Sequence, residues 1–318
     1  MPRTEAVIVD AVRTPSGRGK PVGALSGVHP ADLLAGVLAE LVNRTGLDPV
    51  LVDDVIGGCV TPSGEQAANI TRTAVLSSGL PESVPAVTID RQCGSSQQAA
   101  AFAAQGVIAG AYDIVIACGV ESMSRVPMGS NAGGASPSGE LLSARYPDGL
   151  VNQGVAAELV ASRWGLSRAE LDDFAATSHQ RAAEAAAAGA FEGELMPVPT
   201  PGSGSVSADE TIRPGTTVER LARLAPSFRT DALASRFPQL EWQITPGNSS
   251  PLTDSASAVL IMGREAAERL GMTPRAVPLL RGRGQRSAPH ADGHRAGHTQ
   301  AARPQRSGAG RGRRLRGQ

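Results

Sequence analysis

The stretch TIDRQCGSSQQAAAFAAQGVIAG, residues 88–110, decides how the surrounding chain folds. The residues just before Cys93, PAVTID at 85–90, have the character of a buried strand, with Val87 and Ile89 on one face. The alanine-rich residues after it contain no proline and predict a helix with Ser95 or Ser96 as its N-cap. Cys93 therefore stands where a strand turns into the first turn of a helix.

A cysteine at such a turn has two interpretations. Unpaired N–H groups and the helix dipole stabilise negative charge there, so the thiol should ionise more easily and could act as a nucleophile. A small buried residue filling a tight turn would fit the same context, because free cysteine is often buried for packing alone. The local sequence leaves both interpretations open.

The alternation of strand and helix continues on both sides of Cys93. Strands are expected at 5–14, 53–60, 85–90 and 113–119, and helices at 30–46, 65–79 and 95–110. Such an alternation predicts an α/β sheet with helices on its faces.

The character changes after residue 120. Residues 121–242 are rich in Gly, Ser and Pro at first, then predict helices at 152–165, 167–189 and 217–226, with a capping box from Ser167 and Glu170. We interpret them as a large inserted loop domain. Residues 243–263 resume the alternation of strand and helix seen before residue 120. A polar turn is followed by the apolar strand ASAVLIM, and a short helix is expected at 264–272.

Composition narrows the class of protein. The formal net charge is zero, which gives no indication of a nucleic-acid or membrane partner. Three cysteines without metal-ligand or disulfide spacing are typical of a reducing cytosol, so we expect a cytoplasmic protein without a metal site. The start of the chain does not have the pattern of a signal peptide, and the most apolar region is interrupted by polar residues and glycines.

Four segments carry a family resemblance. They are DRQCGSSQQA at 90–99, GVESMSRVPM at 119–128, VNQG at 151–154 and TPGNSSPLTD at 245–254. Through them, residues 1–277 resemble the thiolase family, specifically its degradative 3-ketoacyl-CoA thiolases. The resemblance implies the layered α/β/α/β/α thiolase fold, with an N-terminal domain formed by residues 1–120 and 243–272 and a CoA-binding loop domain at 121–242.

The resemblance also assigns roles to residues. Cys93 would be the nucleophile that accepts the acyl group, and its backbone N–H would contribute to an oxyanion hole. Ser250 matches the family's serine that contacts the pantetheine arm of CoA. Asn152 and Gln153 match the stretch that lines the pantetheine channel, although ordinary capping of the next helix explains them equally well. The implied ligands are acyl-CoA and CoA as co-substrate, with no permanently bound cofactor, and the implied assembly is a homodimer or homotetramer.

Other residues receive simpler interpretations. Cys59 and Cys118 end apolar strands and are expected to pack in the core, His29 is expected at a helix start, and His179 is expected to be solvated. Two positions depart from the family pattern: Ala225 replaces a basic residue that reaches the CoA phosphates, and Ser255 replaces the glycine of the usual Asp-Gly pair.

The last part of the chain does not resemble a thiolase. Residues 273–318 form an Arg/Gly-rich tail, predicted to be disordered, where the family has a second α/β half with a catalytic histidine and a second catalytic cysteine. The tail could bind RNA, and three histidines at four-residue spacing could bind metal. Translation out of frame fits better, because 38 of the 41 residues at 278–318 have codons that begin with C or G.

We therefore expect a thiolase N-terminal half and loop domain without the C-terminal half. The activity of the family is thiolysis of 3-ketoacyl-CoA, or the reverse condensation, in fatty-acid or sterol side-chain β-oxidation. This chain as written is expected to turn over poorly, because losing one member of a catalytic unit costs nearly as much as losing all of them. The alternatives are a biosynthetic acetoacetyl-CoA thiolase and a non-catalytic truncated thiolase with a basic nucleic-acid-binding tail.

Overall fold

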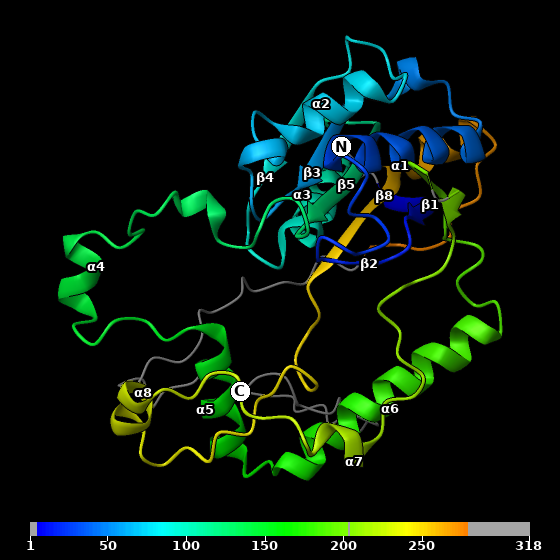
Figure 1. Cartoon of the computed structure of the whole chain (residues 1–318). Coiled ribbons are helices and arrows are strands. Elements are labelled where there is room, and N and C mark those ends of the chain that lie inside the picture. Colours follow the sequence, from blue (N-terminus) through cyan, green and yellow to red (C-terminus); the bar gives the residue numbers. More distant parts are fainter. Residues whose placement is uncertain (1–4, 203, 279–318) are drawn as a thin grey trace, which may run out of the picture.

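A six-stranded sheet forms the centre of the computed structural model, which describes residues 5–202 and 204–278 (Figure 1). The strand order is β1-β8-β5-β3-β4, with β2 also paired to β8. β3 is parallel to β4 and β5, whereas β8 is antiparallel to β5, β1 and β2. The strands are β1 (Ala6–Arg13), β2 (Gly17–Arg18), β3 (Asp54–Gly58), β4 (Ala86–Ile89), β5 (Ile114–Ser122) and β8 (Thr253–Gly263). The predicted α/β class is confirmed, and the sheet is mixed.

Helices cover both faces of this sheet. α1 (Pro30–Thr45) and α2 (Ile70–Ser77) pack on one face, and α3 (Ser95–Ala109) packs on the other. Strand β5 is buried on both sides, because successive side chains point to opposite faces of a strand. Its residues alternate between the two cores, with Ile114, Ile116, Cys118 and Val120 on the α1 side and Val115 and Ala117 on the α3 side.

The ends of α1 show how the sequence sets a helix. His29 precedes the helix as N-cap, and its Nδ1 accepts a hydrogen bond from the Ala31 amide at 3.2 Å. Pro30 occupies the first turn, where a missing N–H costs nothing. Gly46 ends the helix with φ of 63°, a left-handed conformation that glycine adopts without strain. The prediction that His29 starts a helix is confirmed.

The inserted residues form a second group of elements. Figure 1 shows α5, α6, α7 and α8 gathered away from the sheet, with α4 on an arm between the two parts. A small core of four side chains, Val155, Phe237, Leu240 and Trp242, lies among them. The helices are α4 (Glu140–Arg145), α5 (Gln153–Trp164), α6 (Arg168–Ala187), α7 (Val218–Leu221) and α8 (Asp231–Arg236). Strands β6 (Val198–Thr200) and β7 (Gly204–Val206) make a hairpin, and α9 (Arg264–Arg269) follows β8.

Two adjacent acidic residues fasten the inserted residues to the sheet. Asp209 accepts hydrogen bonds from both terminal nitrogens of Arg13, at 2.7 and 3.0 Å, and from the Ser16 amide at 2.7 Å. Burial opposes ionisation of Asp209, but the hydrogen bonds from Arg13 and Ser16 outweigh it, so the pKa of this carboxyl lies below its ordinary value. Glu210 accepts from the backbone amides of Arg18 and Ala24 at 2.8 and 2.9 Å.

Several predicted boundaries were wrong, each for a local reason. The helix expected at 65–79 begins only at Ile70, because Ala68 and Asn69 adopt positive φ and Asn69 caps the helix that follows. The helix expected at 217–226 is the single turn α7. Strand β4 was expected to be buried, but it is the last strand of the sheet, and Val87 is 42% exposed.

The helix predictions at 152–165 and 167–189 are confirmed by α5 and α6, and the capping box of Ser167 and Glu170 is present. The division into domains at residues 121 and 242 stays a prediction. The Arg/Gly-rich tail falls almost entirely at 279–318, outside the described residues. Within the described residues, no helix is both long and apolar enough to span a bilayer.

Candidate active site

Cys93 lies on a tight turn between β4 and α3, and its side chain is exposed. Gln92, just before it, has φ of 48°, a left-handed conformation that is uncommon for a residue with a side chain. The Gln92 amide donates to Asp90 Oδ1 at 2.7 Å, which fixes the start of the turn. Backbone strain of this kind is found preferentially at functional sites, so the turn is a good candidate for one.

Ser95 closes the same turn. Its hydroxyl donates to the Gln92 carbonyl at 2.6 Å and accepts from the Arg91 amide at 2.9 Å. The expectation that Ser95 or Ser96 caps the helix was therefore wrong: Gly94 is the N-cap, and α3 begins at Ser95. The side chain of Ser95 is committed to holding the turn that presents Cys93.

Two glycines let the start of α3 approach the sheet closely. Gly58 at the end of β3 and Gly119 on β5 are register partners in neighbouring strands. A Cβ on Gly58 would lie 2.3 Å from the Ser96 amide nitrogen, and one on Gly119 would lie 1.9 Å from Ser96 Oγ. Both distances are far below van der Waals contact. At Gly58 the neighbours are backbone atoms, so only glycine there allows α3, and with it Cys93, to sit where it does, whereas at Gly119 the nearest neighbour is a side-chain hydroxyl.

A network of polar side chains lies near the ends of β3 and β5, next to this turn. Gln66 is fully buried, and its Nε2 donates to the Thr61 carbonyl at 2.8 Å and to Glu121 Oε1 at 2.9 Å. Glu121 Oε2 accepts from the Val60 amide at 2.7 Å. The amide of Cys59 in turn donates to the Ile89 carbonyl at 3.1 Å, immediately before the Cys93 turn.

The three cysteines differ sharply in environment. Cys59 is buried, and burial together with the charge of Glu121 raises the pKa of its thiol to about 12. Cys118 is also buried, which likewise raises the pKa of its thiol to about 12. Their predicted packing roles are confirmed, although Cys118 lies within β5 rather than at its end. Cys93 is the exposed thiol of the three.

The other predicted site residues lie on the inserted part and on the loop before β8. Asn152 is the N-cap of α5, and its Oδ1 accepts from the Val155 amide at 2.9 Å. Gln153 is the first residue of that helix and is exposed, and Ser250 is exposed on the loop after the TPGN turn. The capping interpretation of Asn152 is therefore confirmed, and the pantetheine role stays a prediction.

Two buried carboxylates hold the segment that leads to Ser250. Glu158 on α5 accepts hydrogen bonds from the Gln243 and Ile244 amides at 2.8 and 2.7 Å. Asp172 on α6 accepts from Asn248 Nδ2 at 2.9 Å and pairs with Arg168 at 2.7 Å. Neither residue was predicted as part of the site from the sequence. The available signal was an acidic residue, Glu158, set among the apolar positions of α5.

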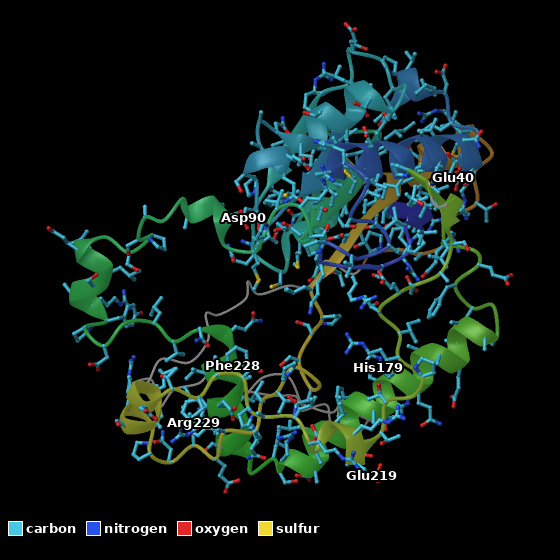
Figure 2. The ribbon with its side chains drawn as sticks, in the orientation of Figure 1. Glu40, Asp90, His179, Glu219, Phe228 and Arg229 are labelled. Carbon is cyan, nitrogen blue, oxygen red and sulfur yellow. The ribbon has the colours of Figure 1, made fainter. Side chains whose placement is uncertain are left out.

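The structure does not join all of the predicted residues by direct contacts. Figure 2 shows Asp90, at the start of the Cys93 turn, at the margin of the sheet unit, whereas Phe228 lies beside α5. Among the described residues, no hydrogen bond connects Cys93 with Asn152, Gln153 or Ser250. Cys93 thus lies on the sheet unit, whereas the candidate CoA contacts lie on α5 and on the loop before β8.

His179 was expected to be solvated, and this was wrong. It is half-buried on α6, and its Nδ1 accepts a hydrogen bond from the Arg213 amide at 3.3 Å. Burial, and secondarily the charge of Arg213, lower the pKa of His179 below its ordinary value. His179 therefore links α6 to the segment before α7.

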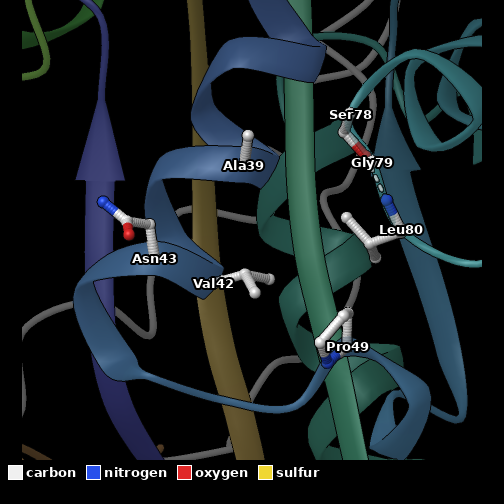
Figure 3. A pocket seen from close by; sticks show the side chains of 7 residues that line it. All are labelled: Ala39, Val42, Asn43, Pro49, Ser78, Gly79 and Leu80. Atoms are coloured by element: carbon white, nitrogen blue, oxygen red, sulfur yellow. Dashed lines mark hydrogen bonds between the residues drawn. The ribbon is translucent and has the colours of Figure 1, made fainter.

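A hollow of about 240 Å³ lies elsewhere on the molecule (Figure 3). Ala39, Val42 and Asn43 of α1 line it together with residues 49 and 78–80. Residues 49 and 80 precede β3 and β4, whereas Cys93 follows the other end of β4. The hollow therefore lies at the opposite ends of these strands and is not part of the Cys93 site.

Comparison with known proteins decides the family. The family model for the thiolase N-terminal domain matches residues 6–265, a span that includes Cys93, Asn152, Gln153 and Ser250. The chain belongs to the thiolase family. It is 43% identical over 281 residues to the steroid 3-ketoacyl-CoA thiolase FadA6 of Mycobacterium tuberculosis, covering 86% of this chain and 65% of that protein.

Two further relatives show how broadly this thiolase sequence is shared. The chain is 40% identical over 282 residues to the 3-ketoacyl-CoA thiolase of Bacillus subtilis, covering 85% of this chain and 68% of the relative. It is also 40% identical over 277 residues to the peroxisomal 3-ketoacyl-CoA thiolase 2 of Arabidopsis thaliana, covering 84% and 57%. The thiolase chain described here thus spans roughly two thirds or less of these relatives.

Proposed function

We propose that Cys93 accepts an acyl group from a 3-ketoacyl-CoA in a thiolase reaction of β-oxidation. The Cys93 thiolate attacks the 3-keto carbon, and the bond between that carbon and the α-carbon breaks. The released α-carbon takes up the proton that the Cys93 thiol gave up on ionising and leaves as acetyl-CoA, while the acyl group remains on sulfur as a thioester. The thiol of a second CoA then attacks the thioester carbon, the bond from that carbon to the Cys93 sulfur breaks, and the shortened acyl-CoA leaves as the CoA proton passes to the released Cys93 thiolate.

One observation carries this proposal. In a chain of the thiolase family, Cys93 is the exposed cysteine and sits on the strained turn at the start of α3, whereas Cys59 and Cys118 are buried thiols with pKa values raised to about 12. The start of a helix favours the negative charge of a thiolate and of the oxyanion that forms on attack. The Cys93 amide is the oxyanion donor that this chain supplies.

CoA would bind across the inserted residues and the loop before β8. Asn152 uses its side-chain oxygen to cap α5, which leaves its side-chain NH₂ group to donate to the pantetheine arm. Gln153 and Ser250 are exposed and available for the same arm. The basic residue that the family places before the proline at 226 is Ala225 here, so we expect weaker binding of the CoA phosphates.

Turnover of this chain as written is proposed to be slow. Its three cysteines all precede residue 119, so no second cysteine of the Cys-x-Gly type is present to move the α-carbon proton. The family resemblance suggests a homodimer or homotetramer, and light scattering of the purified chain tests the oligomeric state. The cytoplasmic location is suggested by the cysteine content.

A single-turnover experiment tests the proposal. The chain is mixed with a 3-ketoacyl-CoA, and the intact mass and the released acetyl-CoA are measured. We expect a mass gain of one acyl group that maps to Cys93 and an equal amount of acetyl-CoA. Cys93→Ala should give neither, and Cys118→Ala, the matched buried control, should give both. Acylation that persists in Cys93→Ala would refute the assignment.

A second experiment tests the CoA contacts. Ser250→Ala should weaken protection of Cys93 from alkylation by CoA several-fold, whereas the neighbouring Ser249→Ala should not, because Ser249 Oγ already donates to the Thr245 carbonyl at 2.7 Å. Equal protection in wild type and Ser250→Ala would remove Ser250 from the CoA site while leaving the role of Cys93 intact.

A further inference from the structure

Three buried oxygen atoms meet where β5 ends and β8 begins. Ser122 and Asp254 are register partners in these antiparallel strands, and both residues are completely buried. Directly opposed side chains lie on the same face, with Cβ atoms about 4.5–5.5 Å apart. The Ser124 amide donates to Asp254 Oδ1 at 2.9 Å, which brings Ser124 to the same place.

None of the three has a hydrogen-bond partner in the described protein. The atoms are Ser122 Oγ, Ser124 Oγ and Asp254 Oδ2. Buried polar side-chain atoms in proteins are nearly always paired, so three neighbouring exceptions require an explanation. The requirement is strongest for Asp254, because an unpaired oxygen on a buried carboxylate is especially costly.

The strand on the other side of Asp254 supplies no side-chain partner. On the other side of β8, Asp254 is paired with Gly17, which has no side chain to offer. A Cβ on Gly17 would lie 2.9 Å from Leu25, so the space beyond it is filled by an apolar, fully buried side chain. The remaining protein donors are the hydroxyls of Ser122 and Ser124 themselves. Burial raises the pKa of Asp254 and the Ser124 side chain opposes this by favouring the charged form, but neither hydroxyl is in hydrogen-bond geometry with Asp254 Oδ2. A small molecule that bridges the three oxygen atoms would supply the missing bonds.

We propose that one buried water molecule binds between Ser122, Ser124 and Asp254. The water donates a hydrogen bond to Asp254 Oδ2 and accepts one from each serine hydroxyl. Three bonds to otherwise unpaired buried groups is the usual number for an internal water. A Ca²⁺ or Mg²⁺ ion would need about six oxygen ligands, more than this site offers.

The proposed water site adjoins the polar network of Gln66 and Glu121. Gln66 Oε1 accepts from the Ser122 amide at 2.7 Å, so the site adjoins the network that lies beneath the strand ends near Cys93. Asp254 is four residues after Ser250 on the same segment. The water thus fastens the end of β5 to the start of β8, between the two parts of the proposed active site.

A high-resolution crystal structure of the full chain tests this directly. We expect one density peak within about 2.6–3.2 Å of all three oxygen atoms. A direct bond from Ser124 Oγ to Asp254 Oδ2 with no peak between them would overturn the proposal. So would an anomalous signal at the site after the crystal is soaked in rubidium chloride, since that would identify a cation.

Urea unfolding gives an independent test in solution. Either Ser122→Ala or Ser124→Ala removes one bond and releases the shared water, so the double variant should lower the midpoint by less than the sum of the two single losses. Ser257→Ala, on the same strand but outside the site, is the matched control and should leave the midpoint close to wild type. Strictly additive losses would contradict a shared water.

Discussion

Replacing Gly58 by alanine should displace the start of α3 and with it Cys93. The added Cβ would lie 2.3 Å from the Ser96 nitrogen, 2.5 Å from the Ser95 carbonyl carbon and 2.8 Å from the Ser96 Cα. All three neighbours are backbone atoms, so no side chain can rotate away to relieve the contact. The first turn of α3 must move outward.

The size of the effect follows from these distances. Carbon atoms pack at about 3.5–4.0 Å, so the helix start must shift by roughly 1 Å. Overpacking of this kind costs about 1–3 kcal/mol, which corresponds to a fall in Tm of roughly 2–5 °C for a chain of this size. A displacement of about 1 Å at a reacting group can reduce the rate about 100-fold.

Thermal unfolding and the acylation rate of Cys93 together measure this prediction. Gly119→Ala should have a smaller effect, because its nearest neighbour is the Ser96 hydroxyl, which can rotate. Gly139→Ala is the control, since a Cβ there meets nothing within 4 Å and the φ of Gly139 is −83°. If Gly58→Ala keeps both the Tm and the acylation rate of Gly139→Ala, the proposed support of Cys93 is wrong.

Three further predictions concern the inserted residues. Asp209→Asn should lower the free energy of unfolding by about 1–3 kcal/mol, because Arg13 and Ser16 lose a charged acceptor, and urea unfolding measures it. The pKa values of Asp209 and Glu210 are lowered in the folded chain. The stability that these two carboxylates add is therefore complete above about pH 4.5 and is lost as the pH falls through their folded pKa values. In Asp209→Asn, the free energy of unfolding should depend less steeply on pH in this acid range. Glu158→Ala should weaken CoA protection of Cys93 several-fold, as the Gln243 and Ile244 amides lose their acceptor.

Each of these has a contrary outcome. If Asp209→Asn has the same free energy of unfolding as wild type at neutral pH, the ion pair of Arg13 with Asp209 adds no net stability to the folded chain. An acid unfolding curve identical to wild type would exclude Asp209 as a contributor to the pH dependence. Normal CoA protection in Glu158→Ala would show that the segment before Ser250 holds its shape without the carboxylate.

The core of the fold and the position of Cys93 could be predicted because they depend on local patterns. The pattern of apolar residues predicts the strand before Cys93 and the helix after it. His29 and Gly46 mark the start and the end of α1 in the sequence. The apolar run of β4, however, reads the same whether the strand is central or at an edge. Only the sheet order decides that difference.

The support of the site could not be predicted, because it depends on contacts between distant segments. Gly58 and Gly119 read as ordinary strand glycines until the register places them side by side under Ser96. Asp172 reads as a helix surface residue until the 243–248 segment returns to it. Glu158 stands among the apolar positions of α5, but the sequence does not say that its partners are the amides of that same segment. The positive φ of Gln92 has no signature in a single sequence.

The most direct test of the central claim is a competition among the three thiols. A limiting amount of iodoacetamide is added at neutral pH, and labelled peptides are mapped by mass spectrometry. A thiol with a pKa of about 12 has roughly one thiolate in 10⁵ molecules at pH 7, so Cys59 and Cys118 should stay unlabelled. We predict label on Cys93 alone, and none there after incubation with a 3-ketoacyl-CoA. Label on Cys59 or Cys118 at a comparable rate, or an acyl-CoA that does not protect Cys93, would contradict the account.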